Sequence, residues 1–213
     1  DDYDATQLRS ILKYRRDAFK PRALAENVIP LVAALGSQTH GDARKAIDLF
    51  RWAGELAERR GSNTVTEDDV RDAQDKYTEN RKLRHISGIS TQKKLSIYAV
   101  AATAHYGSEE REWIPAGPAY ETYQFIADTM DADKYSRETF VNHVTEQSTY
   151  GVLDFDRQGK GRGRGVHMHF TLSEDPETII ETIREDSRFA DLSQEDAPIR
   201  AVVRDQMKKF HKK

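Results

Sequence analysis

Residues 152–172 read VLDFDRQGKGRGRGVHMHFTL, and this stretch decides the fold of the C-terminal half of the chain. Two short runs of apolar and aromatic residues, 152–156 and 166–172, lie on either side of a segment with four glycines. Short runs of this kind around a Gly-rich segment predict a β-hairpin. Because glycine is entropically costly to order, four glycines in one loop indicate a need for bare backbone rather than for packing.

The segments before the hairpin have helical periodicity instead. Apolar residues recur at helical spacing over 91–105 and 118–130, and Ser136 is an N-cap for a third helix. The polar segment 108–117 is expected to be a loop, and a further helix is expected to start at Asp175. Three helices followed by a hairpin, with a tight turn between the second and third helices, predict a winged-helix domain over residues 85–192, with the Gly-rich loop as its wing.

Four amphipathic helices are predicted before this domain, over about 4–20, 24–38, 41–60 and 66–84. Asp4 and Gln7 have the spacing of a capping box, and Thr66 precedes an acidic first turn. Pro30 marks either a kink in the second helix or a later start of that helix. The sequence thus predicts a mostly α-helical protein: a four-helix domain at 1–84, a short connection at 87–90, the winged helix, and a basic tail at 193–213 that is either helical or frayed.

Composition limits the possible functions. The 213 residues carry a net charge of −3 and include no cysteine, so disulfides and cysteine-based metal sites are excluded. No apolar run has the length that spans a bilayer and no signal peptide is recognised, so we expect a cytoplasmic protein without a membrane partner. The chain starts at Asp1 without a methionine, which suggests the C-terminal part of a longer protein.

The wing residues are the first candidates for DNA contacts. Between Arg157 and Gly165 all four charged residues are basic: Arg157, Lys160, Arg162 and Arg164. Arginine gains from the negative potential of a narrow minor groove, and each phosphate that is neutralised releases counterions. The alternative is a solvated hairpin tip whose charges only keep an edge soluble.

The third predicted helix of the winged helix provides the second set of candidates: Arg137, Thr139 and Asn142. Arginine can pair bidentately with guanine and asparagine with adenine, so Arg137 and Asn142 are the best candidates for base readout in a major groove. Glu138 and Glu146 on the same helix oppose phosphate and count against DNA binding.

Other kinds of site are poorly supported. The loop lacks the Gly-Lys-Ser/Thr ending of a phosphate-binding P-loop and joins two strands rather than opening a helix. His167 and His169 are expected on the same side of a strand, but no third ligand is near them in the sequence, so no metal site is predicted. No Ser/His/Asp or zinc-protease signature is present.

Three N-terminal segments resemble the lid of AAA+ ATPases: YDATQLRSILKYRRDAF at 3–19, HGDARKAIDLFRWAGELAE at 40–58 and TEDDVRDAQDK at 66–76. They are similar in particular to the archaeal origin-recognition and cell-division-control initiator family. The Gly-Asp-Ala-Arg step is the most specific part, and the winged helix with a Gly/Arg-rich wing agrees with it. The resemblance extends to Leu192.

The resemblance implies an AAA+ lid followed by a DNA-binding winged helix. It makes Arg44 the sensor-2 residue, which reaches the γ-phosphate of ATP held by another domain; the alternative is that Arg44 pairs with Asp48, four residues on. Walker A and Walker B motifs are absent from this chain, so it is not expected to be an enzyme. ATP and Mg²⁺ are expected only in a full-length parent, and no cofactor is expected for this chain.

The resemblance further implies that the parent recognises double-stranded origin DNA and helps to load the replicative helicase in DNA replication initiation. Two alternatives remain: a winged helix that binds a partner protein, favoured by the net negative charge, and a winged-helix transcription regulator. The lid segment argues against the regulator, because a regulator has no need for a sensor-2 helix.

Overall fold

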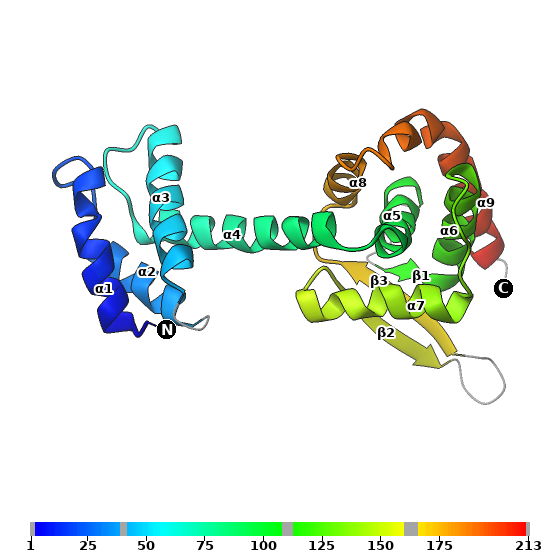
Figure 1. Ribbon diagram of the computed structural model, residues 1–213, viewed down its shortest axis with the longest axis horizontal. Coiled ribbons are helices and arrows are strands. Elements are labelled where there is room, and N and C mark those ends of the chain that lie inside the picture. The colour runs from blue at the N-terminus through cyan, green and yellow to red at the C-terminus, as the bar shows by residue number, and fades with distance from the viewer. Residues whose placement is uncertain (1–2, 39–41, 108–112, 160–165, 212–213) are drawn as a thin grey trace. The chain divides into compact units, whose positions relative to one another are not determined.

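A computed structural model describes residues 3–38, 42–107, 113–159 and 166–211 (Figure 1). The chain divides into two compact units, Asp1–Arg81 and Lys82–Lys213, which we call unit 1 and unit 2. Helices dominate both units, and the described strands all lie in unit 2. The mostly α-helical architecture predicted from the sequence is confirmed.

Unit 1 contains α1 (Ala5–Tyr14), the short 3-10 helix η1 (Arg16–Ala18), α2 (Val28–Ser37), α3 (Ala43–Arg59) and the first part of α4 (Glu67–Gly88). The capping box at Asp4 and Gln7 is confirmed, since the Asp4 carboxylate accepts from the backbone of Thr6 and Gln7. In α3, the Asp42 side chain accepts from the N–H groups of Arg44 and Lys45.

Of the two alternatives at Pro30, the structure has the later start, because α2 begins at Val28 rather than at Leu24. Leu24 forms a parallel β-bridge with Val65, and the Ala25 N–H donates to the Val65 carbonyl at 3.0 Å. Because these backbone groups are already paired outside a helix, residues 23–25 cannot join α2. Pro30 consequently lies in the first turn of α2, where its missing N–H costs little.

The core of unit 1 is formed by apolar residues from all four helices, including Leu8, Val32, Leu49 and Val70, which are fully buried. Helices α2 and α3 approach each other closely at Gly36. A Cβ built on Gly36 would lie 2.8 Å from the Cβ of Ala46. Only glycine fits there without displacing one of the helices.

Helix α4 extends to Gly88, past the predicted end near Arg84, so the predicted connection at 87–90 is shorter than expected. Ile86 is fully buried in the core of unit 2. Its burial extends the helix through a stretch that has no clear apolar period in the sequence.

Unit 2 is built around α5 (Thr91–Tyr106), which is buried along almost its entire length. Helices α6 (Ala116–Thr129) and α7 (Arg137–Glu146) follow, and then the 3-10 helix η2 (Gln147–Tyr150). Tyr123 and Phe140 pack ring against ring, with centroids 5.2 Å apart, and both are fully buried. The predicted order of three helices and a hairpin is confirmed.

A three-stranded antiparallel sheet, in the order β1-β3-β2, completes the winged helix. Strand β2 (Leu153–Gly159) pairs with β3 (Val166–Leu172), in a register that runs from Leu153 opposite Leu172 to Gly159 opposite Val166. Strand β1 (Ile114–Pro115) pairs with β3 through Ile114 opposite Phe170. The prediction of a loop over 108–117 is therefore wrong at 114–117, where β1 is followed by the first residues of α6, and residues 108–112 lie outside the described residues.

The last elements are α8 (Pro176–Arg184), the 3-10 helix η3 (Ala190–Glu195) and α9 (Asp196–His211). The sequence left open whether the segment after Ser193 is helical or frayed. In the structure it is helical, and Ile199, Val203 and Met207 lie in the core of unit 2. The described part of this segment thus packs as part of the winged-helix unit.

Candidate nucleic-acid interface

Helix α7 is the candidate recognition helix, and its start is fixed by Ser136. The Ser136 hydroxyl accepts a hydrogen bond from the Thr139 N–H at 3.2 Å, as an N-cap does. Phe140 and Val144 are fully buried one turn apart and hold one side of α7 against the core. The opposite side of the helix carries exposed side chains.

Asn142 lies at the centre of that exposed side. At about 100° per residue, it is about 180° from the midpoint between Phe140 and Val144. The Asn142 side chain is exposed, with Glu138 and Glu146 on either side of it. An exposed amide on the outward face of a helix can donate to and accept from the edge of one base.

The charge of Glu146 is compensated within the fold. Lys93 of α5 donates to the Glu146 carboxylate at 2.7 Å. From the sequence, both Glu138 and Glu146 are expected to oppose DNA phosphates. In the structure, only Glu138 of the two lacks an ion pair among the described residues. The helical periodicity of α7 does not reveal this ion pair, because Lys93 belongs to another helix.

His143 lies on the inner side of α7, where its ring packs edge-on against Tyr135 with centroids 5.6 Å apart. Burial, and next the positive charge of Lys93, lower the pKa of His143. His143 is therefore neutral at pH 7 and adds no positive charge to the face that Asn142 occupies.

The other two predicted residues of α7 are placed differently from Asn142. Thr139 is half-buried, and its hydroxyl lies 3.0 Å from the Ser136 hydroxyl, so it takes part in the cap. Arg137 is exposed, and its guanidinium lies 3.9 Å from the position of a Cβ on Gly117, at the start of α6. The structure therefore does not bring Arg137 and Asn142 together on one face.

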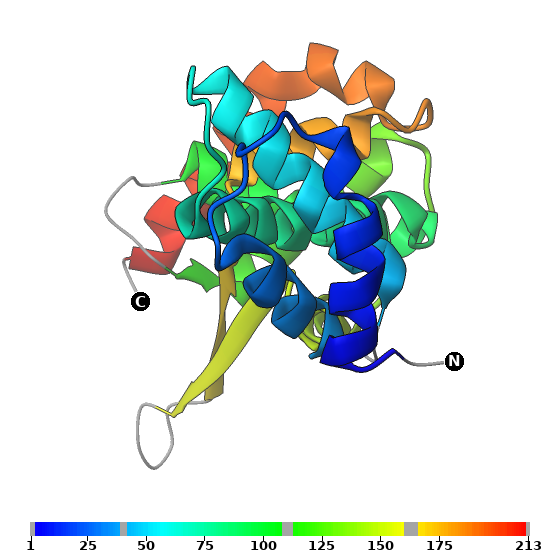
Figure 2. The ribbon, with the colours of Figure 1, turned by 90° about the vertical axis from the view of Figure 1, so that its left-hand side faces the viewer.

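The β2–β3 hairpin is the candidate wing. Figure 2 shows the two strands extending away from the helices of unit 2. Arg157 is exposed on β2, opposite Met168. The other wing candidates, Lys160, Arg162 and Arg164, lie outside the described residues.

The stem of the hairpin has a mixed charge. Asp154 and Asp156 are exposed and alternate along β2 with Phe155, whose side chain is 41% exposed. The positive charge predicted for the wing is thus confined to Arg157 and residues further along the hairpin. Repulsion by the two carboxylates favours contact with DNA through the far end of the hairpin rather than its base.

Of the histidine pair, the structure describes the side chain of His169. The His169 ring is buried against Trp113, with centroids 4.1 Å apart, and the His167 side chain lies outside the described residues. No group of three or more His, Cys, Asp or Glu residues that could hold a metal is found among the described residues.

Arg44 lies in the first turn of α3 with an exposed side chain. Its backbone N–H donates to the Asp42 carboxylate at 2.8 Å, but its guanidinium forms no ion pair with any described residue. Asp48, the suggested partner, instead lies 3.9 Å from Arg51. An exposed arginine at a helix N-terminus is suited to an anionic ligand.

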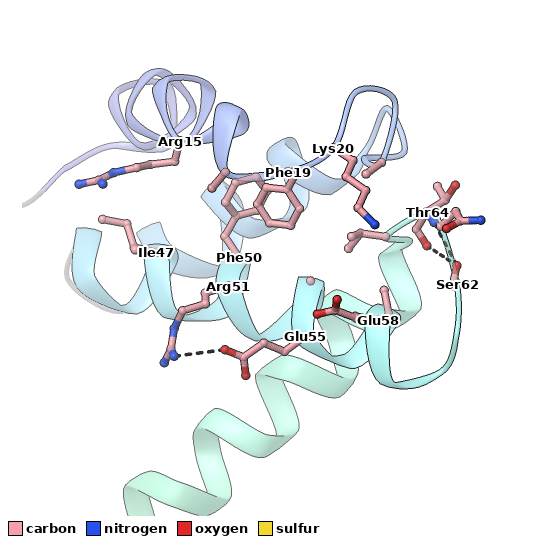
Figure 3. A pocket seen from close by; sticks show the side chains of 16 residues that line it. Arg15, Phe19, Lys20, Ile47, Phe50, Arg51, Glu55, Glu58, Ser62 and Thr64 are labelled. Atoms are coloured by element: carbon pink, nitrogen blue, oxygen red, sulfur yellow. Dashed lines mark hydrogen bonds and ion pairs between the residues drawn. The ribbon is translucent and has the colours of Figure 1, made fainter.

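Unit 1 also contains a pocket of about 410 Å³ between η1, α3 and the segment that leads to α4 (Figure 3). The rings of Phe19 and Phe50 meet in it, with centroids 4.5 Å apart. Arg51 and Glu55 pair with each other at its edge, at 3.2 Å. None of the residues predicted to form a site lines this pocket.

Two ion pairs, of which Lys94–Asp186 is largely buried, attach the C-terminal elements to the winged helix. Lys94 of α5 contacts Asp186 at 2.6 Å, and Arg184 of α8 contacts both Tyr98 and Asp196. Hydrogen bonds from Arg188 and then from Lys94 lower the pKa of Asp186, while burial raises the pKa of Tyr98 to about 12. These contacts hold α8 and α9 in place beside α5.

A lid-like helical unit followed by a winged helix defines the class of protein, and comparison with known families agrees. Residues 9–75 match the Cdc6 AAA+ ATPase-type lid domain. Residues 84–182 match the C-terminal winged-helix domain of CDC6. The chain belongs to the archaeal ORC1/Cdc6 family and carries its lid and winged-helix domains.

The relatives support the same assignment. ORC1-type DNA replication protein 5 of Halobacterium salinarum is 48% identical over 209 residues, which are 98% of this chain and 49% of the relative. The ORC1-type DNA replication protein of Pyrococcus furiosus is 38% identical over 175 residues, covering 80% of this chain and 40% of the relative. The chain thus spans about half the length of these relatives.

A solved structure has the same fold. The Aeropyrum pernix ORC1 protein in complex with DNA matches with a TM-score of 0.64 and 28% identity, over 90% of this chain and 49% of that chain.

Among the described residues, no helix combines the length and the apolar character that crossing a membrane requires.

Proposed function

We propose that this chain is the DNA-binding region of an archaeal replication initiator, and that unit 2 binds duplex DNA with α7 and the β2–β3 hairpin. The single observation that carries the proposal is the outward face of α7. It presents Asn142 at its centre, and Lys93 compensates one of its two carboxylates.

Two further observations support the proposal. The A. pernix ORC1 protein, whose fold this chain shares, was solved with DNA. The hairpin extends from the helices and carries Arg157, and the sequence adds Lys160, Arg162 and Arg164 beyond it. In this arrangement α7 lies in the major groove and the wing enters the adjacent minor groove.

The wing is tested by replacing both Arg162 and Arg164 with alanine and measuring duplex binding by fluorescence anisotropy at several salt concentrations. Each lost phosphate contact should weaken binding and reduce the slope of log K against log[salt] by about 1. We therefore expect the double variant to bind more weakly and with a slope lower by about 2.

A matched control is the double variant Arg59→Ala and Arg71→Ala, which removes the same charge from exposed positions of unit 1. It should bind like the wild-type chain. If the wing variant keeps the affinity and the salt slope of the wild type, the wing does not contact DNA.

The wider role also belongs to the proposal. In the longer protein, ATP and Mg²⁺ would be held by residues outside this chain, and Arg44 would reach the γ-phosphate as sensor 2. Its exposed guanidinium and its place in the first turn of α3 support that contact. We propose that the complete protein acts at replication origins on the nucleoid, in the cytoplasm, and helps to load the replicative helicase.

A partner protein is the second candidate ligand of unit 2. The net charge of −3 favours it, and so does Glu138 on the outward face of α7, which has no ion pair with a described residue. A wild-type chain that does not bind duplex DNA even at low salt would support this candidate over DNA.

A further inference from the structure

A small hollow lies beside the start of α7, and residues of α6 and α9 contribute to its lining. Its volume is about 260 Å³. Arg137 of α7 and Lys209 of α9 line it together with Gln206, and Gly117 and Glu121 of α6 belong to the same lining. Two basic side chains from elements 72 positions apart in the sequence thus share one cavity.

We propose that this α7–α9 hollow binds a phosphate of the DNA backbone, which makes the C-terminal helix α9 part of the DNA interface. The inference rests on the proposed function. It assigns Arg137 to phosphate rather than to a base, since its side chain lies beside Gly117 and about 140° around α7 from Asn142.

The charges of the hollow suit a single phosphate. The Arg137 guanidinium forms no ion pair with any described residue, so its donors are available. Lys209 contacts Asp205 at 2.6 Å, but both side chains are more than half exposed, and such a surface pair holds the ammonium only weakly. Gln206 adds an amide donor, and Glu121 is the acidic residue that lines the hollow.

The position of the hollow fits the path of a DNA strand. Phosphates line both edges of the major groove, so a helix in that groove has phosphates beside its N-terminal end. In both ribbon views, the end of α9 lies on the same side of unit 2 as the far end of the β2–β3 hairpin (Figures 1 and 2). A duplex that contacts the hairpin and α7 can therefore also reach Lys209.

Two substitutions of opposite sign test the proposal on the full chain. Lys209→Gln should weaken duplex binding about threefold or more and reduce the salt slope by about 1. Glu121→Gln should tighten binding by a similar factor, because it removes the negative charge from the hollow. Damage to the fold could not produce tighter binding, so Glu121→Gln excludes an effect through misfolding.

The controls are Lys208→Gln, next to Lys209 but outside the hollow, and Glu177→Gln on α8, and neither should change the affinity more than about twofold. If Lys209→Gln and Lys208→Gln have equal effects, or if Glu121→Gln leaves binding unchanged, the hollow is not a phosphate site. In that case the proposed function would still stand if the wild-type chain binds duplex DNA and the Arg162/Arg164 variant binds it more weakly. A wild-type chain that does not bind DNA would overturn both.

Discussion

In the proposed complex with DNA, base readout by α7 would depend on Asn142, because it lies opposite the buried Phe140 and Val144. We expect Asn142→Ala to reduce the preference for a sequence selected from random duplexes by about 1–3 kcal/mol, the value of one bidentate pair. Binding to unrelated duplexes should stay the same. Competition anisotropy measures both quantities.

Asn63→Ala, the same change in an exposed loop of unit 1, is the control for Asn142→Ala and should leave the preference intact. A uniform loss of affinity on every duplex would show that Asn142 contacts the backbone. An unchanged sequence preference would show that Asn142 of α7 does not contact a base.

Asp186 gives unit 2 a pH-dependent stability. Hydrogen bonds from Arg188 and then from Lys94 hold its pKa in the folded chain below the ordinary value of 3.8, so its ion pairs with these two residues stabilise the fold above about pH 4 and less as the pH falls below that value. Asp186→Asn should lower the free energy of unfolding at pH 7 by about 2 kcal/mol, because the buried Lys94 loses its counter-charge.

The difference in the free energy of unfolding between Asp186→Asn and the wild type should shrink as the pH falls below about 4. Urea unfolding at pH 7, 4 and 3 measures this difference. Asp191 is an exposed carboxylate on η3, so Asp191→Asn should leave the free energy of unfolding unchanged at all three pH values. A destabilisation that is the same at all three pH values would mean that the charge of Asp186 does not contribute.

At the residue scale, the sequence predicted those features that depend on one helix alone. The outward position of Asn142 follows from helical periodicity, and the Ser136 cap from its residue type. The pairing of Glu146 with Lys93 and the turn of Arg137 toward Gly117 depend on which helices lie side by side. Local sequence does not contain that information.

At the element scale, the packing of α2 on α3 depends on Gly36. Gly36→Ala would place a methyl group 2.8 Å from the Cβ of Ala46, and neither helix can yield without disturbing the core. We expect a loss of about 1–3 kcal/mol in stability, which exceeds the gain that alanine usually brings to a helix. Thermal unfolding followed by circular dichroism measures it.

Gly88→Ala is the matched control for Gly36→Ala. It lies at the end of α4, and a Cβ there would meet no atom within 4 Å, so stability should be unchanged or slightly higher. If Gly36→Ala is as stable as Gly88→Ala, the close approach of α2 and α3 does not constrain the lid unit.

Element boundaries show where tertiary contacts override local signals. The bridge of Leu24 to Val65 delays α2, and the burial of Ile86 extends α4 to Gly88. In α9, the apolar spacing of Ile199, Val203 and Met207 was available in the sequence but was obscured by the basic residues between them. The two-residue strand β1 is too short to give a periodic signal.

At the scale of the whole molecule, two separate cores correspond to the two matched families. The sequence predicted both domains because each has a characteristic order of elements and the lid has the Gly-Asp-Ala-Arg step. The α7–α9 hollow could not be predicted, because it is formed by three helices that meet only in the fold.

Binding of duplex DNA by α7 and the hairpin of unit 2 is best tested by mapping amide chemical shifts of the ¹⁵N-labelled chain while duplex DNA is added. We expect changes in residues 137–146 and 157–169 and at the end of α9, with α1, α3 and α8 unaffected. Changes confined to unit 1 or to α8, or no change at low salt, would contradict it.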